Sequence, residues 1–227
     1  MITAIIATCD DEENLAHALA ALAPAAMDGI VRDAIVVDAG SRDGTLAVAD
    51  EAGCAVVEGS GADALMRAAD RARGDWLLFL SPASVLEAGW QGEALAFVDR
   101  AFMAGNARAR AATFRLRRPE DGAKARIAEG VASFRTRVFA APYGEQGLLI
   151  SRGFYRALGG HRDLAAMADV DLARRIGRRR LTLLRGRALV RRREEERGGV
   201  KRALRNGACV ALFVLRLRPG LIGRLAG

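Results

Sequence analysis

The chain has 227 residues, of which 51% are hydrophobic and 27% charged, so it is long enough to bury a substantial core in one domain, or in one domain with a small appendage. Its formal net charge of +8 favours anionic partners such as nucleotide diphosphates, acidic lipid surfaces or nucleic acid. No apolar run approaches 18 residues, which excludes a membrane-spanning helix at this stage.

The beginning of the chain and its cysteines point to a cytoplasmic protein. The apolar residues 2–7 lack a basic flank and run directly into Asp10 and Asp11, so they read as a first strand, with no secretory signal. The three cysteines Cys9, Cys54 and Cys209 are far apart, and we expect them to be reduced and buried.

The first 80 residues predict strands that alternate with helices. The predicted strands are 2–8, 35–38, 54–57 and 75–80, and the predicted helices are 12–22, 46–52 and 62–73, with Pro24 and Gly29 closing the first helical unit. This alternation predicts an α/β fold with a mostly parallel central sheet flanked by helices.

Beyond Ser81 the pattern is looser. The predicted helices are 90–103, 124–139, one ending near Leu158 and 168–179, and the predicted strands are 111–117, 148–150 and 181–190, with a loop at 142–147. We expect one domain over residues 1–195.

Residues 196–227 form a basic tail that alternates arginines with apolar residues. Such a helix can lie on an anionic membrane, gaining ~1 kcal/mol for each basic residue near the surface. Docking of the tail on the domain or on a partner subunit is an equally good interpretation.

The buried strand at 35–38 ends abruptly at Asp38. Ligands of open α/β sheets bind at the carboxyl ends of the strands, so Asp38 is predicted to face a crevice and to bind a sugar hydroxyl or a base N–H. The alternative is a strand-end turn with a solvated aspartate.

Four segments in order resemble the family 2 glycosyltransferases of the GT-A fold. Residues 5–12 read I-I-A-T-C-D-D-E, similar to I-I-P-T-Y-N-E-E, and residues 36–45 read V-V-D-A-G-S-R-D-G-T, which matches V-V-D-x-x-S-x-D-G-T. Residues 72–80 resemble the strand before the family's metal motif. Residues 142–147, 158–160 and 167–172 resemble a subgroup's P-Y-G-D-Q-G, G-G-F and M-E-D-V-E-L.

The resemblance covers roughly residues 2–180 and implies a nucleotide-diphospho-sugar donor. It implies that Thr8, Asp11 and Asp38 line the nucleotide pocket. It also implies that Asp169 is the general base that takes the proton of the acceptor hydroxyl during an inverting transfer. The alternative interpretation of Asp169 is a helix N-cap.

The same resemblance places Glu145 and Gln146 near the acceptor, although by themselves both are ordinary loop residues. His161, in a Gly-Gly-His-Arg-Asp turn, is more readily read as a surface residue than as a metal ligand.

Three positions depart from the family pattern. The family's metal-binding aspartate, which holds Mg²⁺ or Mn²⁺ against the diphosphate, is Ala83 here, so no metal ligand is predicted and the cofactor is left open. The glutamate before the base is Ala168, and the asparagine before the fourth strand is Arg67. Arg67 or Arg71 could replace the metal as a cationic clamp on the diphosphate.

The sequence therefore favours a glycosyltransferase-like enzyme whose activity is impaired or independent of metal. Its acceptor is left open, and the basic tail is compatible with an acceptor close to a membrane. The alternative is a catalytically inactive module of the same fold that binds nucleotide-sugars or other proteins. A homo-oligomer and a location on the inner face of the membrane are both compatible with the sequence. An aromatic content of 5%, with no stacking platform, argues against nucleic acid.

Overall fold

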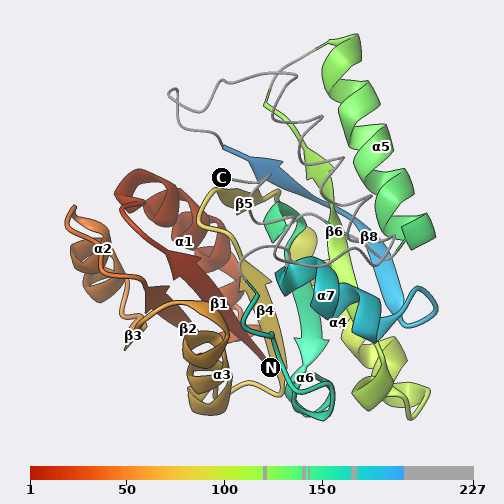
Figure 1. Ribbon diagram of the computed structural model, residues 1–227, viewed down its shortest axis with the longest axis horizontal. Coiled ribbons are helices and arrows are strands. Elements are labelled where there is room, and N and C mark those ends of the chain that lie inside the picture. The colour runs from red at the N-terminus through yellow and green to blue at the C-terminus, as the bar shows by residue number, and fades with distance from the viewer. Residues whose placement is uncertain (120–121, 140–141, 143, 165–167, 192–227) are drawn as a thin grey trace.

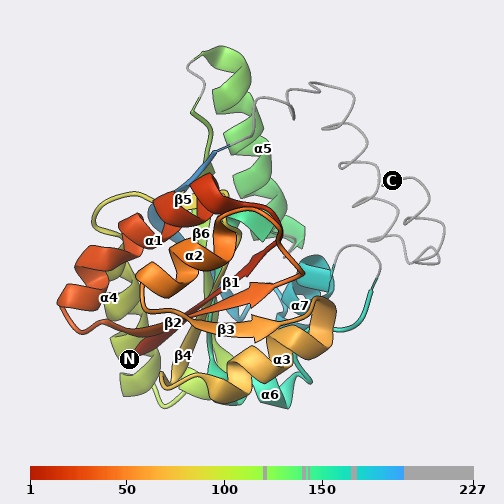
Figure 2. The same cartoon turned by 90° about the vertical axis from the view of Figure 1, so that its left-hand side faces the viewer.

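The computed structural model describes residues 1–119, 122–139, 142, 144–164 and 168–191. Over these residues the chain forms an eight-stranded sheet in the order β3-β2-β1-β4-β7-β6-β8-β5. Helices cover both faces of the sheet (Figures 1 and 2), which confirms the predicted α/β fold with a mostly parallel sheet. The predicted tail, residues 196–227, lies outside the described residues.

The first part of the sheet is parallel because each strand returns through a helix. Its elements are β1 (Ile2–Thr8), α1 (Glu12–Met27), β2 (Val31–Asp38), α2 (Thr45–Glu51), β3 (Ala55–Glu58), α3 (Gly61–Arg71) and β4 (Trp76–Leu80). The four carboxyl ends therefore meet at one edge of the sheet, which is where the predicted site residues of β1 and β2 lie.

The second part of the sheet is mixed. Its strands are β5 (Ser84–Leu86), β6 (Ala111–Arg117), β7 (Leu148–Ser151) and β8 (Leu181–Val190). Its helices are α4 (Trp90–Met103), α5 (Ala123–Phe139), α6 (Arg152–Ala157) and α7 (Ala168–Ile176), with short 3-10 turns η1 (Ala107–Ala109) and η2 (Gly144–Gln146). Strand β7 runs antiparallel to both β4 and β6, and so joins the two parts.

Two apolar layers hold the helices on the sheet. Alternate residues of the buried strands point to opposite faces, so Ile6 and Leu78 pack on the side of α1 and α4, whereas Ile5 and Leu77 pack on the side of α3 and α6. A smaller cluster under α5 contains Leu116, Ala132 and Val190. Helix α5 extends beyond the rest of the domain in both ribbon views (Figures 1 and 2).

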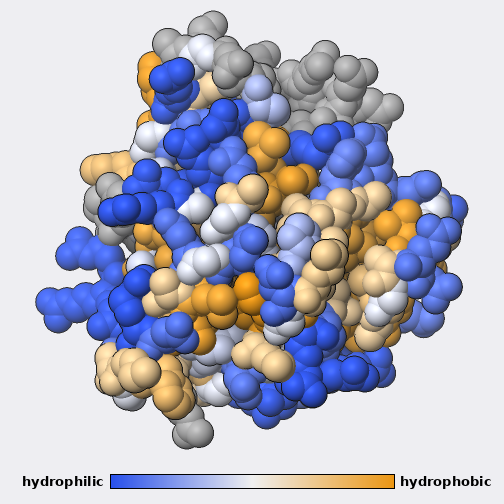
Figure 3. Space-filling view, turned by 180° about the vertical axis from the view of Figure 1, so that it is seen from behind, coloured by the Kyte–Doolittle hydropathy of each residue, from blue (hydrophilic) through white to orange (hydrophobic). Residues whose placement is uncertain are grey.

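The surface carries both hydrophilic and apolar side chains (Figure 3). Polar side chains cover much of the back of the molecule, with apolar patches between them (Figure 3). Phe102 and Met103, at the end of α4, are 73% and 84% exposed. Among the described helices, none combines the length and the apolar character needed to cross a bilayer.

Three local predictions were wrong. Helix α1 continues through Pro24 to Met27, where Leu22 and Ala25 on either side of the proline are both buried in the core and hold this turn on the sheet. Strand β2 begins four residues earlier than predicted, at Val31, where it pairs with Ile2. Strand β5 was not predicted, because three residues are too few to show a period.

Candidate functional site

The loops that follow β1 and β2 are tied to each other by side chains that cap helix ends. Thr45 accepts the N–H of Asp11 at 3.0 Å, and Asp43 accepts the N–H of Glu12 at 3.1 Å, at the start of α1. In return Glu12 accepts the N–H of Gly44 at 3.0 Å, at the start of α2. We call these two loops, residues 9–12 and 41–45, the clasp. The clasp includes most of the acidic residues that follow β1. Its side chains accept hydrogen bonds from N–H groups at the starts of the two helices, which would otherwise have no partner.

Hydrogen bonding within the clasp perturbs one of its carboxylates. The pKa of Asp43 lies below its usual value, chiefly because the Thr45 hydroxyl donates a 2.5 Å hydrogen bond to it, helped by backbone N–H groups of Thr45 and Glu12. Asp43 is thus stabilised in its ionised form, and this supports the clasp at neutral pH.

Asp38 lies at the carboxyl end of β2 but is only 3% exposed. One of its oxygens accepts the N–H groups of Gly40 and Ser41, both at 3.0 Å, and the other accepts the Ser41 hydroxyl at 2.5 Å. It is therefore neither solvated nor open to a ligand in this state, and its role in binding a base stays a prediction.

Thr8 pairs with Asp38 across β1 and β2 and is 5% exposed. Its hydroxyl oxygen is buried and has no hydrogen-bond partner among the described residues. Asp11 is half-buried in the clasp, where its carboxylate accepts the side-chain amide of Asn14 at 3.1 Å. The structure brings Thr8, Asp11 and Asp38 together at one sheet edge, as the resemblance implies, without testing what they bind.

A pocket of about 240 Å³ opens at the carboxyl ends of β1 and β4. Its walls come from β1, α3, the residues after β4, the η2 turn and α7. The residues that matter for chemistry here are Ser81, Gly144, His161 and Asp169. This volume has room for a group the size of a sugar ring rather than for a whole nucleotide.

Asp169 is the predicted site residue that lines this pocket. It stands in the first turn of α7 with its side chain 58% exposed. Its Oδ1 lies 3.1 Å from Nε2 of His161, and its Oδ2 lies over Gly144, where a Cβ would come within 2.6 Å of it. Any side chain at position 144 would displace the carboxylate.

His161 was interpreted as a surface residue, and that interpretation is wrong. It is 5% exposed and packs edge-on against Phe79, with ring centroids 5.0 Å apart. Its Nδ1 lies 2.8 Å from the hydroxyl of Tyr155. Burial raises the pKa of Tyr155 to about 12. A lone histidine gives no periodic signal, so sequence reasoning could find this contact only through the fold.

Glu145 and Gln146 lie in η2, next to the pocket but not in its walls. Gln146 is fully buried, and its side-chain amide donates to the carbonyl of Phe114 at 2.9 Å and accepts from Thr136 at 3.2 Å. Glu145 is half-buried, and its backbone carbonyl accepts the Ser84 hydroxyl at 2.8 Å. In this state Gln146 connects β6 to α5, and contact of either residue with an acceptor stays a prediction.

The two arginines considered as diphosphate clamps lie along β3. Arg67 donates to the carbonyl of Glu58 at 2.7 Å and to Asp63 at 2.9 Å, and Arg71 donates to the carbonyl of Val56 at 3.2 Å. Neither lines the Asp169 pocket. Both guanidinium groups would have to leave these carbonyls to reach a ligand there.

The residues after β4 do not fit the divalent metal that the family resemblance implies. Ala83 offers only a methyl group, and the Ser84 hydroxyl is already donated to Glu145. The described part of the chain contains no cluster of three or more histidine, cysteine, aspartate or glutamate side chains placed to hold a metal ion. Hard divalent cations require several oxygen ligands, so this donor set is inadequate.

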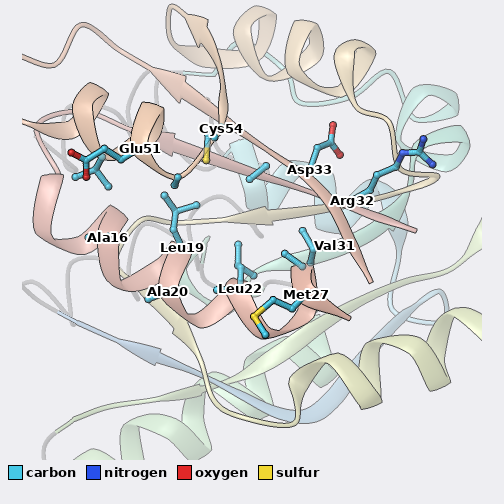
Figure 4. Close-up of a pocket in the computed structure, with 16 residues that line it drawn as sticks. Ala16, Leu19, Ala20, Leu22, Met27, Val31, Arg32, Asp33, Glu51 and Cys54 are labelled. Atoms are coloured by element: carbon cyan, nitrogen blue, oxygen red, sulfur yellow. The ribbon is translucent and has the colours of Figure 1, made fainter. Parts of the chain in front are cut away.

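A second pocket, of about 660 Å³, lies between α1 and α2 beside the start of β2. Leu19, Leu22 and Val31 face its interior, and Glu51 and Arg32 lie at opposite ends (Figure 4). None of the predicted site residues lines it.

The cysteines fit their prediction only partly. Cys54 is half-buried beside this second pocket, and burial raises the pKa of its thiol. Cys9 is exposed because β1 has ended at Thr8, so the expectation that it is buried was wrong. Cys209 lies outside the described residues.

With this geometry established, comparison with known proteins identifies the family. The model of glycosyl transferase family 2 matches residues 3–140. The chain belongs to this family. The match ends before the pocket residues His161 and Asp169, which lie on the later part of the fold. A comparison with curated proteins gave no match.

Solved glycosyltransferase structures share the fold. Glucosyl-3-phosphoglycerate synthase from Mycobacterium tuberculosis, in complex with Mn²⁺, UDP and glucosyl-3-phosphoglycerate, has a TM-score of 0.61 at 18% identity over 96% of this chain and 81% of that one. TarS from S. aureus, in complex with UDP-GlcNAc, has a TM-score of 0.65 at 14% identity over 99% of this chain and 70% of that one. At these identities the likeness establishes the GT-A fold.

Proposed function

We propose that this chain transfers a sugar from a nucleotide-diphospho-sugar to a hydroxyl acceptor, with inversion at the anomeric carbon. The observation that carries the proposal is the position of Asp169, a carboxylate at the wall of a sugar-sized pocket at the carboxyl edge of the sheet. The family assignment and the UDP and UDP-GlcNAc bound by the structural relatives support a nucleotide-sugar donor.

The chemistry requires one base and one leaving group. As the acceptor oxygen attacks the anomeric carbon, its proton passes to Asp169, and the bond between that carbon and the diphosphate oxygen breaks. The electron pair of that bond leaves with the nucleoside diphosphate. We derive no step through a metal ion, because the residues after β4 do not fit one.

The second candidate is a catalytically inactive module that binds nucleotide-sugars or other proteins. The observation that favours it is Ala83, since without a carboxylate there the charge of the leaving diphosphate is not neutralised by a bound cation. It predicts binding without turnover.

Calorimetry with uridine, guanosine and thymidine diphospho-sugars, each with and without Mn²⁺, tests both candidates. Binding followed by release of the nucleoside diphosphate would support the transferase. Binding without release would support the inactive module. The absence of binding under every condition would contradict both.

We further propose that the acceptor lies at an anionic membrane surface reached by the basic tail. Support comes from the composition of residues 196–227 and from the net charge of +8. A cytoplasmic location and a homo-oligomer stay predictions.

A further inference from the structure

We propose that His161 is a positioning residue that holds the carboxylate of Asp169 in one orientation over Gly144, with its own tautomer fixed by Tyr155. This inference rests on the proposed function of Asp169 as a base. Histidine stands here directly after Gly159 and Gly160, where the subgroup's G-G-F motif has phenylalanine, so the contact comes from a residue of this chain and not from that motif.

The hydrogen bonds of Tyr155 determine the tautomer. Its hydroxyl oxygen accepts the backbone N–H of His161 at 3.2 Å and lies 2.8 Å from Nδ1 of the same residue. If the hydroxyl proton is donated to Nδ1, every group is satisfied and the ring proton must be on Nε2. The opposite tautomer would leave the buried hydroxyl proton without an acceptor among the described residues and would turn the Nε2 lone pair toward a carboxylate.

In the satisfied tautomer, Nε2–H donates to Oδ1 of Asp169 across 3.1 Å. The other oxygen, Oδ2, lies over Gly144 at the pocket wall. The histidine thus engages one oxygen of the carboxylate and leaves the other to accept a proton. A side chain that is 58% exposed would otherwise rotate among several orientations.

The residues around His161 hold it rigidly. Tyr155 is fully buried, and Phe79 packs against both rings, with its centroid 4.9 Å from that of Tyr155 and 5.0 Å from that of His161. The Tyr155 hydroxyl carries its proton at neutral pH, and burial raises its pKa further, to about 12.

The backbone beside His161 is tied to the same helix that carries Asp169. Arg175 of α7 donates to the carbonyls of Leu158 and Gly160 at 2.6 and 2.8 Å and to Asp171 at 2.7 Å. These bonds connect the turn before His161 to α7. They therefore limit changes in the distance between His161 and Asp169.

Nuclear magnetic resonance of the full chain, labelled with ¹⁵N at histidine, tests the hydrogen-bond network without needing activity. The chain has two histidines, and the exposed His17 is identified by its loss in His17→Gln. We expect the proton of the His161 ring to be on Nε2, with Nδ1 as the acceptor. Asp169→Asn should shift the Nε2 resonance, and Tyr155→Phe should shift the Nδ1 resonance. A proton on Nδ1, or an Nε2 resonance that does not respond to Asp169→Asn, would overturn the proposal.

Kinetics separate positioning from a purely structural role. His161→Phe keeps an aromatic ring beside Phe79 and Tyr155 but cannot donate a hydrogen bond. We therefore expect kcat for release of UDP from UDP-glucose, with water as the acceptor, to fall about tenfold to a hundredfold at unchanged KM. His161→Gln can still donate an N–H and should recover part of the loss, and His17→Gln should have no effect.

The outcomes distinguish this inference from the proposed function. If the unaltered chain releases UDP and His161→Phe matches it in kcat, the inference fails and the transferase stands. If the unaltered chain releases no nucleoside diphosphate from any of the diphospho-sugars, the transferase fails and the positioning role fails with it, whatever tautomer the spectra show.

Discussion

At the scale of single residues, the site is a carboxylate whose two oxygens have different surroundings. Oδ1 of Asp169 faces a buried imidazole, and Oδ2 faces a glycine backbone at the wall of the pocket. A base with this asymmetry presents a single oxygen to its substrate. The acceptor hydroxyl is therefore expected to approach from the side of Gly144.

Asp169→Asn tests the base directly. Asparagine keeps the shape and can still accept the hydrogen bond of His161, but it cannot take a proton. We expect turnover to fall about 10³-fold while the Kd for the donor changes little. Calorimetry and a product assay measure the two quantities. Asp163→Asn, at an exposed carboxylate nearby, is the matched control, and an equal loss in both variants would contradict the assignment.

The raised pKa of Tyr155 predicts a loss of stability at alkaline pH. Its pKa is about 12 in the folded chain, above the ordinary value of 10.0, so the neutral hydroxyl stabilises the fold at and below pH 10. This contribution, at most about 3 kcal/mol, is lost as the pH rises from about 10 to about 12. Chemical unfolding of the chain and of Tyr155→Phe between pH 9 and about 12 measures it. The variant should lose less stability over that range, and parallel curves would contradict the prediction.

At the scale of elements, the clasp explains why the acidic residues after β1 are where they are. They cap α2 and position the loop of β2, while residues of that loop cap α1. The motif that resembles the family therefore encodes the relative position of two helices. Any nucleotide contact of Asp11 would be made from within this preformed structure.

Asp43→Asn tests the clasp. The variant keeps the size of the side chain but is a weaker acceptor for the N–H of Glu12 and for Thr45. We therefore expect the free energy of unfolding to fall by about 1 kcal/mol and the Tm by about 2–4 °C. The pKa of Asp43 is lowered in the fold, so its contribution is present above its usual value of 3.8 and lost as the pH falls below it. The difference between the two proteins should vanish in acid. Asp50→Asn, at an exposed position of α2, removes the same charge and should change little.

The link between β4 and β5 carries a prediction about the response to metal. Ala83→Asp would add a carboxylate where the family has its metal ligand, and we expect the affinity for UDP to increase at least about tenfold when Mn²⁺ is added. Ala83→Asn provides the size without the charge. Calorimetry with and without Mn²⁺ measures the effect, and equal responses in the two variants would contradict it.

At the scale of the whole molecule, the fold was predictable where buried strands carry unbroken apolar runs. The strands predicted at 75–80 and 35–38 correspond to β4 and to the end of β2, and α4 was predicted over its observed bounds. The site was less accessible, because Asp38 and Gln146 satisfy their hydrogen bonds internally and His161 is buried by contacts from α6, α7 and β4. The Phe114 partner of Gln146 and the Phe79 ring beside His161 are distant in sequence and leave no local pattern, whereas the partners of Asp38, Gly40 and Ser41, lie within three residues of it.

The basic tail carries a prediction for the complete chain. We expect the protein to co-sediment with vesicles that contain phosphatidylglycerol, and to bind at least about tenfold more weakly when Arg202, Arg205, Arg216 and Arg218 are all changed to Gln. Neutral phosphatidylcholine vesicles are the control. Equal binding of both proteins to anionic vesicles would contradict a role for the tail.

The antiparallel junction of β4 with β7 has a consequence for folding. The Asp169 pocket is lined partly by residues of β1 and β4, such as Ile5 and Phe79, and partly by residues that come after β4 in the chain, such as Gly144 and Ala173. A molecule bound in this pocket contacts both parts of the chain, so its binding favours the state in which both parts are folded. Ligand would therefore raise the midpoint of unfolding, and a fragment that stops at residue 140, where the family match ends, would lack the pocket residues that come later in the chain.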